Sequence, residues 1–116
     1  MRITVFSMAI WASSAGLACA VDGKGIRFWN LTSSTISSVQ LSASGKDAWG
    51  MNQCENDPDG SVDHDERLKI TGVEPGKYDV RLATKQGRVC IVRNIDLRAN
   101  GVFSIEEKQL TDCSPK

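Results

Sequence analysis

The chain has 116 residues, enough for one domain of ordinary size, and its 14 basic residues balance its 14 acidic residues. Nucleic acid and anionic lipid both require a clustered positive charge, so this balance argues against either as a partner. Hydrophobic residues make up 41% of the chain, which is enough to form a packed core and argues against disorder throughout.

The first 20 residues have the three-part pattern of a secretory signal peptide. A positively charged start, an apolar run over residues 3–12 and small residues up to Ala20 make up this pattern. The apolar run is too short for a permanent membrane-spanning helix. We therefore expect residues 1–20 to be removed, and residues 21–116 to form a single domain in the periplasm or outside the cell, with no membrane span.

Two other export routes fit the leader less well. Lipidation of Cys19 requires Leu three residues earlier, where the chain has Gly16. The twin-arginine route requires an Arg-Arg pair, which the leader lacks. The general secretory route is therefore the one we expect.

After the leader, short runs of alternating polar and apolar residues predict strands. They cover residues 25–30, 36–42, 68–73, 77–84, 88–97 and 102–106. Pro75-Gly76 suits a β-turn, because Pro fixes φ at one corner and Gly accepts positive φ at the next. Asn100-Gly101 is a strong hairpin signal. We expect an all-β fold, a small two-layer β-sandwich (Ig-like or similar) of six to seven antiparallel strands, or else a small barrel.

The alternation also predicts which way side chains point. In the clearest strand, Tyr78, Val80 and Leu82 face one way, while Asp79 and Arg81 face the other. In the last strand, the apolar residues at positions 103 and 105 should point inward.

Three cysteines remain if cleavage follows Ala20, namely Cys54, Cys90 and Cys113. An odd number predicts one disulfide and one free thiol, and the sequence leaves the pairing open. Earlier cleavage would keep Cys19 as a fourth cysteine. No C-x-x-C pair occurs, so we expect neither redox catalysis nor a zinc knuckle.

One long excursion, residues 43–67, interrupts the strands, and six of the 14 acidic residues lie between positions 55 and 66. Aligned with the calcium loop of an EF-hand, its ligand positions fall on Glu55, Asp57, Asp59, Asp63 and Glu66. The flanking segments are not helical, which excludes an EF-hand proper. Two interpretations remain: an isolated Ca²⁺ loop on a β scaffold, or a solvated acidic loop with Asx-type turns.

The sequence contains no recognisable catalytic set. His64 is the single histidine and has no nucleophile near it in the sequence. No G-x-S-x-G elbow, P-loop or dinucleotide-binding glycine pattern occurs. A small hydrolase that uses the loop carboxylates is the weakest of the interpretations, because no positioned carboxylate pair is evident.

Two tryptophans outside the leader, Trp29 and Trp49, have two interpretations. They pack in the core or anchor a loop, or they form a stacking surface for a sugar or a partner protein. From the small β scaffold and the long loop we expect a monomeric, non-enzymatic binding module of the cell envelope. Its partner would be a protein or an envelope component, and the alternative is a calcium-binding or calcium-stabilised secreted protein.

Five short motifs are spread over the chain after the leader. They are Phe28-x-Asn30-x-Thr32, Ile36-x-x-Val39-x-x-Ser42, Trp49-Gly50, Gly76-x-Tyr78-Asp79-Val80-Arg81 and Asp96-Leu97. Together they resemble a group of small exported bacterial proteins that often carry the label "Tat pathway signal protein". The resemblance implies a periplasmic β-sandwich of unknown activity, without catalytic residues to carry over. The acidic loop and the missing Arg-Arg pair depart from that group.

Overall fold

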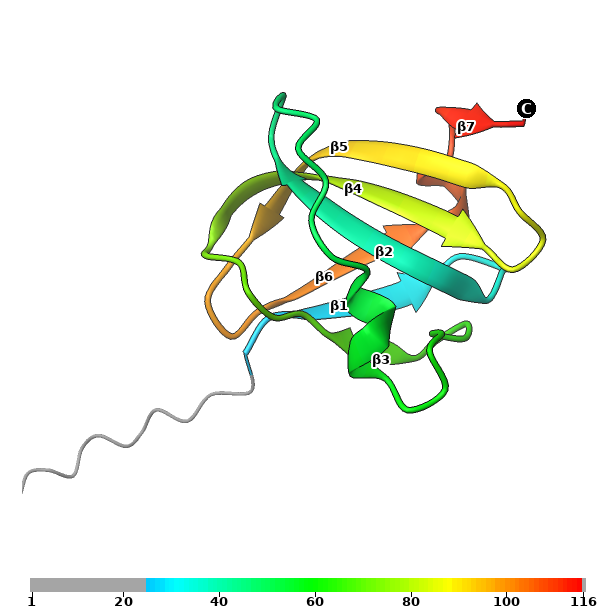
Figure 1. The fold of residues 1–116 in the computed structure, drawn as a ribbon, viewed down its shortest axis with the longest axis horizontal. Helices are drawn as coiled ribbons and strands as arrows, with labels where there is room; N and C mark the ends of the chain where they lie inside the picture. Colours follow the sequence, from blue (N-terminus) through cyan, green and yellow to red (C-terminus); the bar gives the residue numbers. More distant parts are fainter. Residues whose placement is uncertain (1–24, 116) are drawn as a thin grey trace, which may run out of the picture.

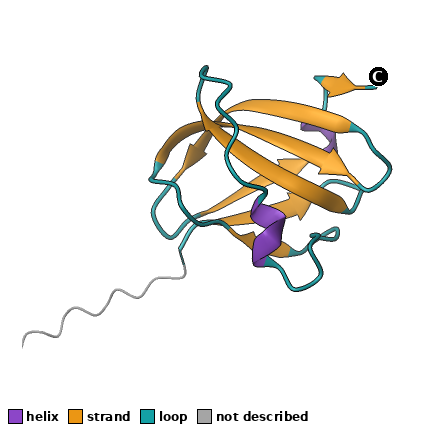
Figure 2. Cartoon of the chain, viewed as in Figure 1, coloured by secondary structure: helices purple, strands orange, loops and turns teal. Residues whose placement is uncertain are grey.

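The structure is a computed structural model that describes residues 25–115, so the predicted signal peptide lies outside the described residues. Strands supply most of its regular structure (Figures 1 and 2). In chain order the elements are β1 Arg27–Leu31, β2 Ile36–Ala43, the 3₁₀ helix η2 Gln53–Asn56, β3 Arg67–Lys69, β4 Gly76–Thr84, β5 Val89–Leu97, β6 Val102–Glu106, the 3₁₀ helix η3 Glu107–Gln109 and β7 Cys113–Ser114.

The strands form two sheets that pack face to face. One has the order β3-β1-β6 and the other β2-β4-β5-β7, and Figure 1 shows the three-stranded sheet below β2, β4 and β5. This arrangement confirms the predicted all-β, two-layer architecture. Within residues 25–115, no helix has the length and apolar character needed to cross a membrane.

The core lies between the two sheets, where their inward side chains meet. Phe28 on β1 and Phe103 on β6 have ring centroids 5.4 Å apart. Val80 and Leu82 on β4, in the other sheet, are fully buried, and so is Ile105 on β6. Each such side chain stabilises the fold by about 1.5–3 kcal/mol through burial. The predicted inward direction of Phe103 and Ile105 is confirmed.

A buried amide closes the turn between β1 and β2. The Asn30 side chain donates to the carbonyl oxygens of Ser34 (2.9 Å) and Val62 (3.0 Å), and its Oδ1 accepts from the backbone and hydroxyl of Thr32. Both residues are fully buried, so these bonds replace the water that a polar pair would otherwise keep. This network gives the Asn30-x-Thr32 motif a structural role.

One strand pair departs from the predicted antiparallel arrangement. β1 and β6 run parallel, with Phe28 opposite Phe103. The strand predicted over residues 68–73 is also shorter than expected. Ile70 still donates to the carbonyl of Ile26 at 3.0 Å, but Gly72, with φ of +76°, turns the chain away. Side-chain alternation identifies the buried face of a strand but not the direction of its neighbour. The parallel pairing of β1 with β6 therefore could not be predicted from the sequence.

The hairpin predicted at Asn100-Gly101 is wrong. The turn itself forms, with the Gly101 N–H donating to the Arg98 carbonyl at 2.9 Å. However, β5 and β6 belong to different sheets. Leu97 before the turn and Phe103 after it are both buried, so the chain crosses from one layer to the other instead of returning along the same sheet.

The excursion after β2 covers the free edge of that strand. The Asn52 side chain makes the hydrogen bonds that a neighbouring strand would make with β2. Its Oδ1 accepts from the Val39 N–H at 3.0 Å, and its Nδ2 donates to the Ser37 carbonyl at 3.2 Å. Gly50 donates to the Leu41 carbonyl at 3.0 Å. Backbone groups that would otherwise attract another chain are thus paired within the molecule.

A buried carboxylate anchors the start of the excursion. Asp79 faces away from the core, as predicted, but it is only 1% exposed because residues 44–47 fold over it. Its oxygens accept from the N–H groups of Gly45 (2.9 Å) and Asn94 (3.1 Å) and from Arg93 (2.9 Å). Burial acts to raise the pKa of Asp79, but these bonds and the Arg93 charge outweigh it and lower the pKa.

Among residues 25–115, the cysteines form one disulfide and leave one free thiol, as predicted for the chain after cleavage. Cys90 and Cys113 form the bridge, with an S–S distance of 2.04 Å, and tie β7 to β5. Cys54 is free and is part of the buried core. Burial, with a smaller contribution from the charge of Asp57, raises its pKa to about 11.

Candidate functional site

The outward side chains of the three-stranded sheet form one surface, which we call the Trp29 face. Its members are Arg67 and Lys69 from β3, Arg27, Trp29 and Leu31 from β1, and Val102, Ser104 and Glu106 from β6. They share a face because strand residues two apart point the same way. Three of these residues are basic and one is acidic, so the face is positively charged although the whole chain is neutral.

The Trp29 ring is fixed in place by two neighbours. Arg67 lies directly opposite it on β3, and the guanidinium carbon is 4.2 Å from the ring centroid, well within the range of a cation–π contact. On the ring's edge, Nε1 donates to Asp65 Oδ1 at 2.9 Å. A ring that is already oriented loses little further freedom when a ligand binds.

The surroundings of the ring combine positive charge with small side chains. On β6 the neighbour of Trp29 is Ser104, which is too short to cover the ring as Arg67 does. Arg27 and Lys69 are also paired across the strands, two residues along from the tryptophan. Within the described residues, Arg27 Nε is buried and has no hydrogen-bond partner. The face therefore offers a stacking ring beside three cations, with the carboxylates of Asp65 and Glu106 at its margin.

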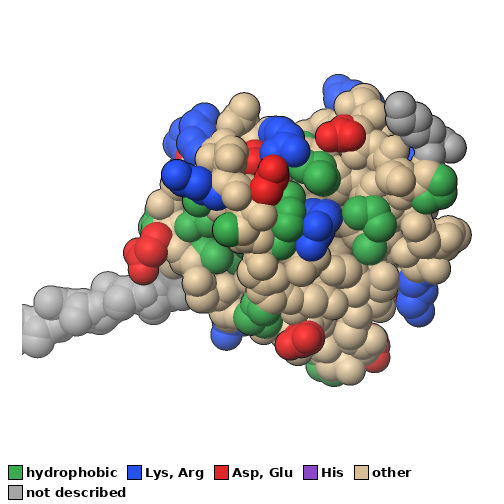
Figure 3. Space-filling model, turned by 45° about the horizontal axis from the view of Figure 1, so that its top comes forward, with side chains coloured by type: hydrophobic (Ala, Val, Ile, Leu, Met, Phe, Trp, Pro, Cys, Tyr) green, Lys and Arg blue, Asp and Glu red, His purple; other side chains and the backbone are tan. Residues whose placement is uncertain are grey.

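Trp49 makes a comparable stack on the opposite sheet. The Arg81 guanidinium carbon lies 4.7 Å from its ring centroid, and Gln40 Oε1 accepts two bonds from the same guanidinium, at 2.9 and 3.1 Å. Across the strands, Arg81 is flanked by Gln40 and the apolar Ile91. Figure 3, in which this side is turned forward, shows hydrophobic side chains among basic and acidic groups, with several basic groups close together at the upper left. This stack therefore lacks the paired basic neighbours of the Trp29 face.

Two of the predicted calcium ligands, Asp57 and Glu66, engage in local hydrogen bonds, and Asp63 accepts from the Thr35 hydroxyl at 2.9 Å. Asp57 accepts from the Asp59 N–H at 2.8 Å, which is the Asx-type turn of the second interpretation. Glu66 accepts from the Asp63 N–H at 2.8 Å, while Glu55 lies in η2. Among residues 25–115, no group of three His, Cys, Asp or Glu side chains is placed to hold a metal ion. Calcium binding stays a prediction.

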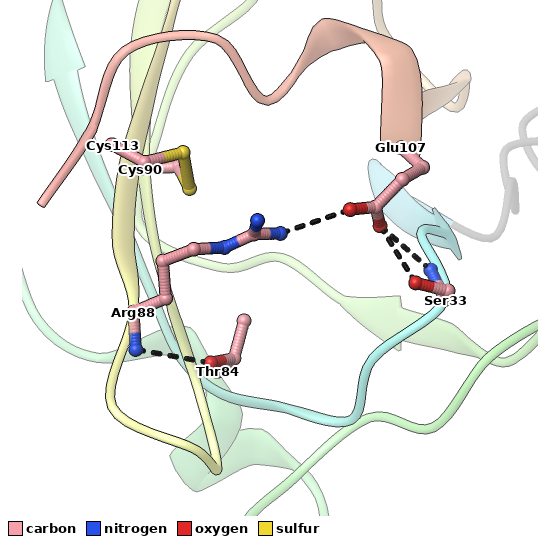
Figure 4. Close-up of a disulfide and its surroundings, with 6 residues drawn as sticks. All are labelled: Ser33, Thr84, Arg88, Cys90, Glu107 and Cys113. Carbon is pink, nitrogen blue, oxygen red and sulfur yellow. Dashed lines mark hydrogen bonds and ion pairs between the residues drawn. A yellow bond between two sulfur atoms is a disulfide. The ribbon is translucent and has the colours of Figure 1, made fainter. Parts of the chain in front are cut away.

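A second polar site lies beside the disulfide (Figure 4). Arg88 extends from the turn before β5, and its guanidinium donates to Glu107 Oε2 at 3.0 Å. Glu107 Oε1 accepts from both the N–H and the hydroxyl of Ser33, each at 3.0 Å. The Ser33 N–H and then the Arg88 guanidinium hold the pKa of Glu107 below its usual range. This chain of contacts joins the C-terminal segment to the turn after β1.

A cavity of about 300 Å³ adjoins Arg88. Its lining residues are Arg88, Leu110, Thr111, Cys113 and Pro115. Four of the five follow η3, so the C-terminal segment, which the disulfide ties to β5, forms most of its wall.

Sequence reasoning found Trp29 and Trp49 as candidate surface residues but missed their basic neighbours. Arg27 stands two residues before Trp29, and Arg67 stands two before Lys69, so alternation alone places each pair on one face of its strand. The pairing of β1 with β3 was needed to bring the two pairs together. No sequence pattern pointed to Arg88 or to its cavity, because the C-terminal residues that form most of the wall show no alternation of polar and apolar residues.

Comparisons with protein-family models, with curated proteins and with solved structures found no match to the chain. The resemblance to small exported bacterial proteins therefore stays a prediction. The function has to be argued from the residues of this chain.

Proposed function

We propose that the protein is an exported, non-enzymatic binding module of the cell envelope that holds an anionic polysaccharide on the Trp29 face. The observation that carries the proposal is the oriented Trp29 ring, stacked by Arg67 and flanked by Arg27 and Lys69. The Cys90–Cys113 disulfide and the leader pattern support export, because disulfides persist in oxidising compartments.

Charge supplies the selectivity in this proposal. Arg67 and Lys69 are exposed, so their guanidinium and ammonium groups can meet carboxylate groups at the surface. Exposed ion pairs contribute little each, about 0–1 kcal/mol, and salt screens them. A repeating anionic polymer gains from several such contacts at once, which a single small anion does not.

Stacking supplies the orientation. A sugar ring presents an apolar C–H face, and a tryptophan ring gives such a face a flat surface of the right size. Ser104, the neighbour of Trp29 on β6, is a small side chain that does not compete with a sugar for the ring. A polymer of acidic sugars therefore matches both features of the face, whereas a neutral polymer matches only one.

Titration calorimetry with polygalacturonate as the anionic probe and dextran as the neutral probe tests the proposal. We expect saturable binding of polygalacturonate that weakens as salt rises, and no binding of dextran. Arg67→Gln together with Lys69→Gln should weaken binding about tenfold, because two charge-assisted contacts are lost.

The chain provides a matched control in its second tryptophan. Trp29→Leu should lose binding, while Trp49→Leu, which removes the comparable stack on the other sheet, should keep it. Equal losses in the two variants, or binding of dextran as tight as that of polygalacturonate, would overturn the proposal. Melting temperatures of both variants show whether each remains folded.

A further inference from the structure

The cavity beside the disulfide has features of a small-molecule site that the Trp29 face does not share. Its volume of about 300 Å³ is at the lower end of the range for ligand pockets. Leu110 packs against the core, and Pro115 and the disulfide add further apolar wall. One cation, Arg88, lines the same space. The wall therefore combines apolar side chains with polar ones and carries a single positioned charge, an arrangement that can orient a small ligand with one charged end.

Arg88 has hydrogen-bonding capacity that the fold does not use. Within the described residues, its guanidinium makes one hydrogen bond, from Nη2 to Glu107, and its side chain is 35% exposed. A guanidinium carries five N–H donors, so the others can serve a ligand. Glu107 holds the group in position, and Ser33 in turn holds Glu107 (Figure 4). The guanidinium is thus held in place before a ligand arrives.

We propose that this cavity binds a carboxylate attached to a small branched apolar group, such as a free N-acylated amino acid or the C-terminal residue of a peptide. Arg88 receives the carboxylate, because a planar guanidinium matches its geometry. Leu110 and Pro115 contact the apolar group, and Thr111, which lines the same wall, bonds a polar atom beside it. The negative charge of Glu107 next to Arg88 limits the affinity to the millimolar range.

The test is an NMR titration of the ¹⁵N-labelled protein with N-acetyl-leucine. We expect saturable shifts of the amide signals of Arg88, Leu110, Thr111 and Cys113. The neutral analogue N-acetyl-leucinamide should bind at least about tenfold more weakly, because it lacks the charge that Arg88 recognises. A peptide ending in Leu with a free carboxylate, beside its amidated form, shows whether the cavity also accepts a chain terminus.

Two variants complete the experiment. Arg88→Gln should weaken binding of N-acetyl-leucine at least about tenfold. Arg98→Gln, which lies just after the far end of β5 and pairs with Asp96, should leave the affinity unchanged. Absence of saturable shifts at the cavity, or equal binding of acid and amide by the unaltered protein, overturns the proposal. The acid–amide comparison holds even if the Arg88 variant fails to fold.

Discussion

Arg67 and Trp29 face each other across the β1–β3 pair, with the guanidinium carbon 4.2 Å from the ring centroid. A cation–π contact of this kind contributes about 0.5–2 kcal/mol, depending on how far it is shielded from water. The same pair is the centre of the proposed binding face. Its two roles, in stability and in binding, can be measured separately.

Replacing Arg67 by Gln should lower the free energy of unfolding by about 1 kcal/mol, because the stacked cation is lost. Arg67→Lys keeps the charge but not the flat stacked group, so its loss should be smaller. Urea denaturation followed by circular dichroism measures both values. Equal stability of the three proteins would show that the stack contributes nothing to the fold.

Asp79 should make the free energy of unfolding depend on pH in the acidic range. Its pKa is lowered in the folded state, so its contribution is present above the unfolded value of about 3.9 and is lost as pH falls through the folded pKa. Asp79→Asn should cost about 2–4 kcal/mol at neutral pH, since the buried groups that bind the carboxylate lose its charge. The variant should also lose less stability than the unaltered protein on acidification below pH of about 4.

Asp47 provides the control for Asp79, because it pairs with the same Arg93 but at 3.4 Å and with its side chain 65% exposed. Asp47→Asn should change the free energy of unfolding by less than about 1 kcal/mol. Thermal melts of both variants over a pH series make the comparison. If the two substitutions lower the free energy of unfolding equally, the contribution of the Asp79 carboxylate to stability does not come from its burial.

The disulfide closes a loop with a sequence separation of 23 residues. Replacing Cys90 and Cys113 by Ser should therefore lower the free energy of unfolding by about 3 kcal/mol. In the unaltered protein, a thiol reagent at neutral pH should find no reactive group until the chain unfolds, because Cys54 is buried and its pKa is about 11. A native protein that reacts readily at Cys54 would contradict this account of the core.

Calcium binding by the 55–66 loop, as the sequence predicts, requires that the local hydrogen bonds of Asp57 and Glu66 be exchanged for metal contacts. Millimolar Ca²⁺ should then raise the melting temperature, and Asp59→Ala should abolish the rise. Mg²⁺ serves as the control for general ionic effects. An unchanged melting temperature in Ca²⁺ would remove the calcium hypothesis.

Local patterns in the sequence were sufficient to predict the positions of β1 to β6 and most of their buried faces, but not β7. Val80 and Leu82 alternate with polar residues, and this alternation is the direct result of one face of β4 meeting the core. The partners of each strand were beyond such reasoning. The turn at Asn100-Gly101 has the local geometry of a hairpin, yet the burial of Leu97 and Phe103 on its two sides sends the chain into the other sheet.

The candidate sites, too, were partly predictable from local sequence and partly dependent on how distant segments pair. Trp29 stands out because tryptophan is rare in the chain, and its strand can be predicted locally. Its cationic neighbours Arg67 and Lys69 come from a strand about 40 positions later, and only the pairing of strands brings them to the ring. The Arg88 cavity depends on a disulfide pairing that spacing alone does not determine.

The fluorescence of Trp29 tests the central proposal most directly. In a protein carrying Trp11→Phe and Trp49→Phe, Trp29 is the single tryptophan, and its emission reports on the surroundings of that ring alone. Titration with polygalacturonate should shift this emission in a saturable manner, and added salt should reverse the shift. Emission that stays constant while calorimetry registers polygalacturonate binding would place the ligand elsewhere and contradict the role of the Trp29 face.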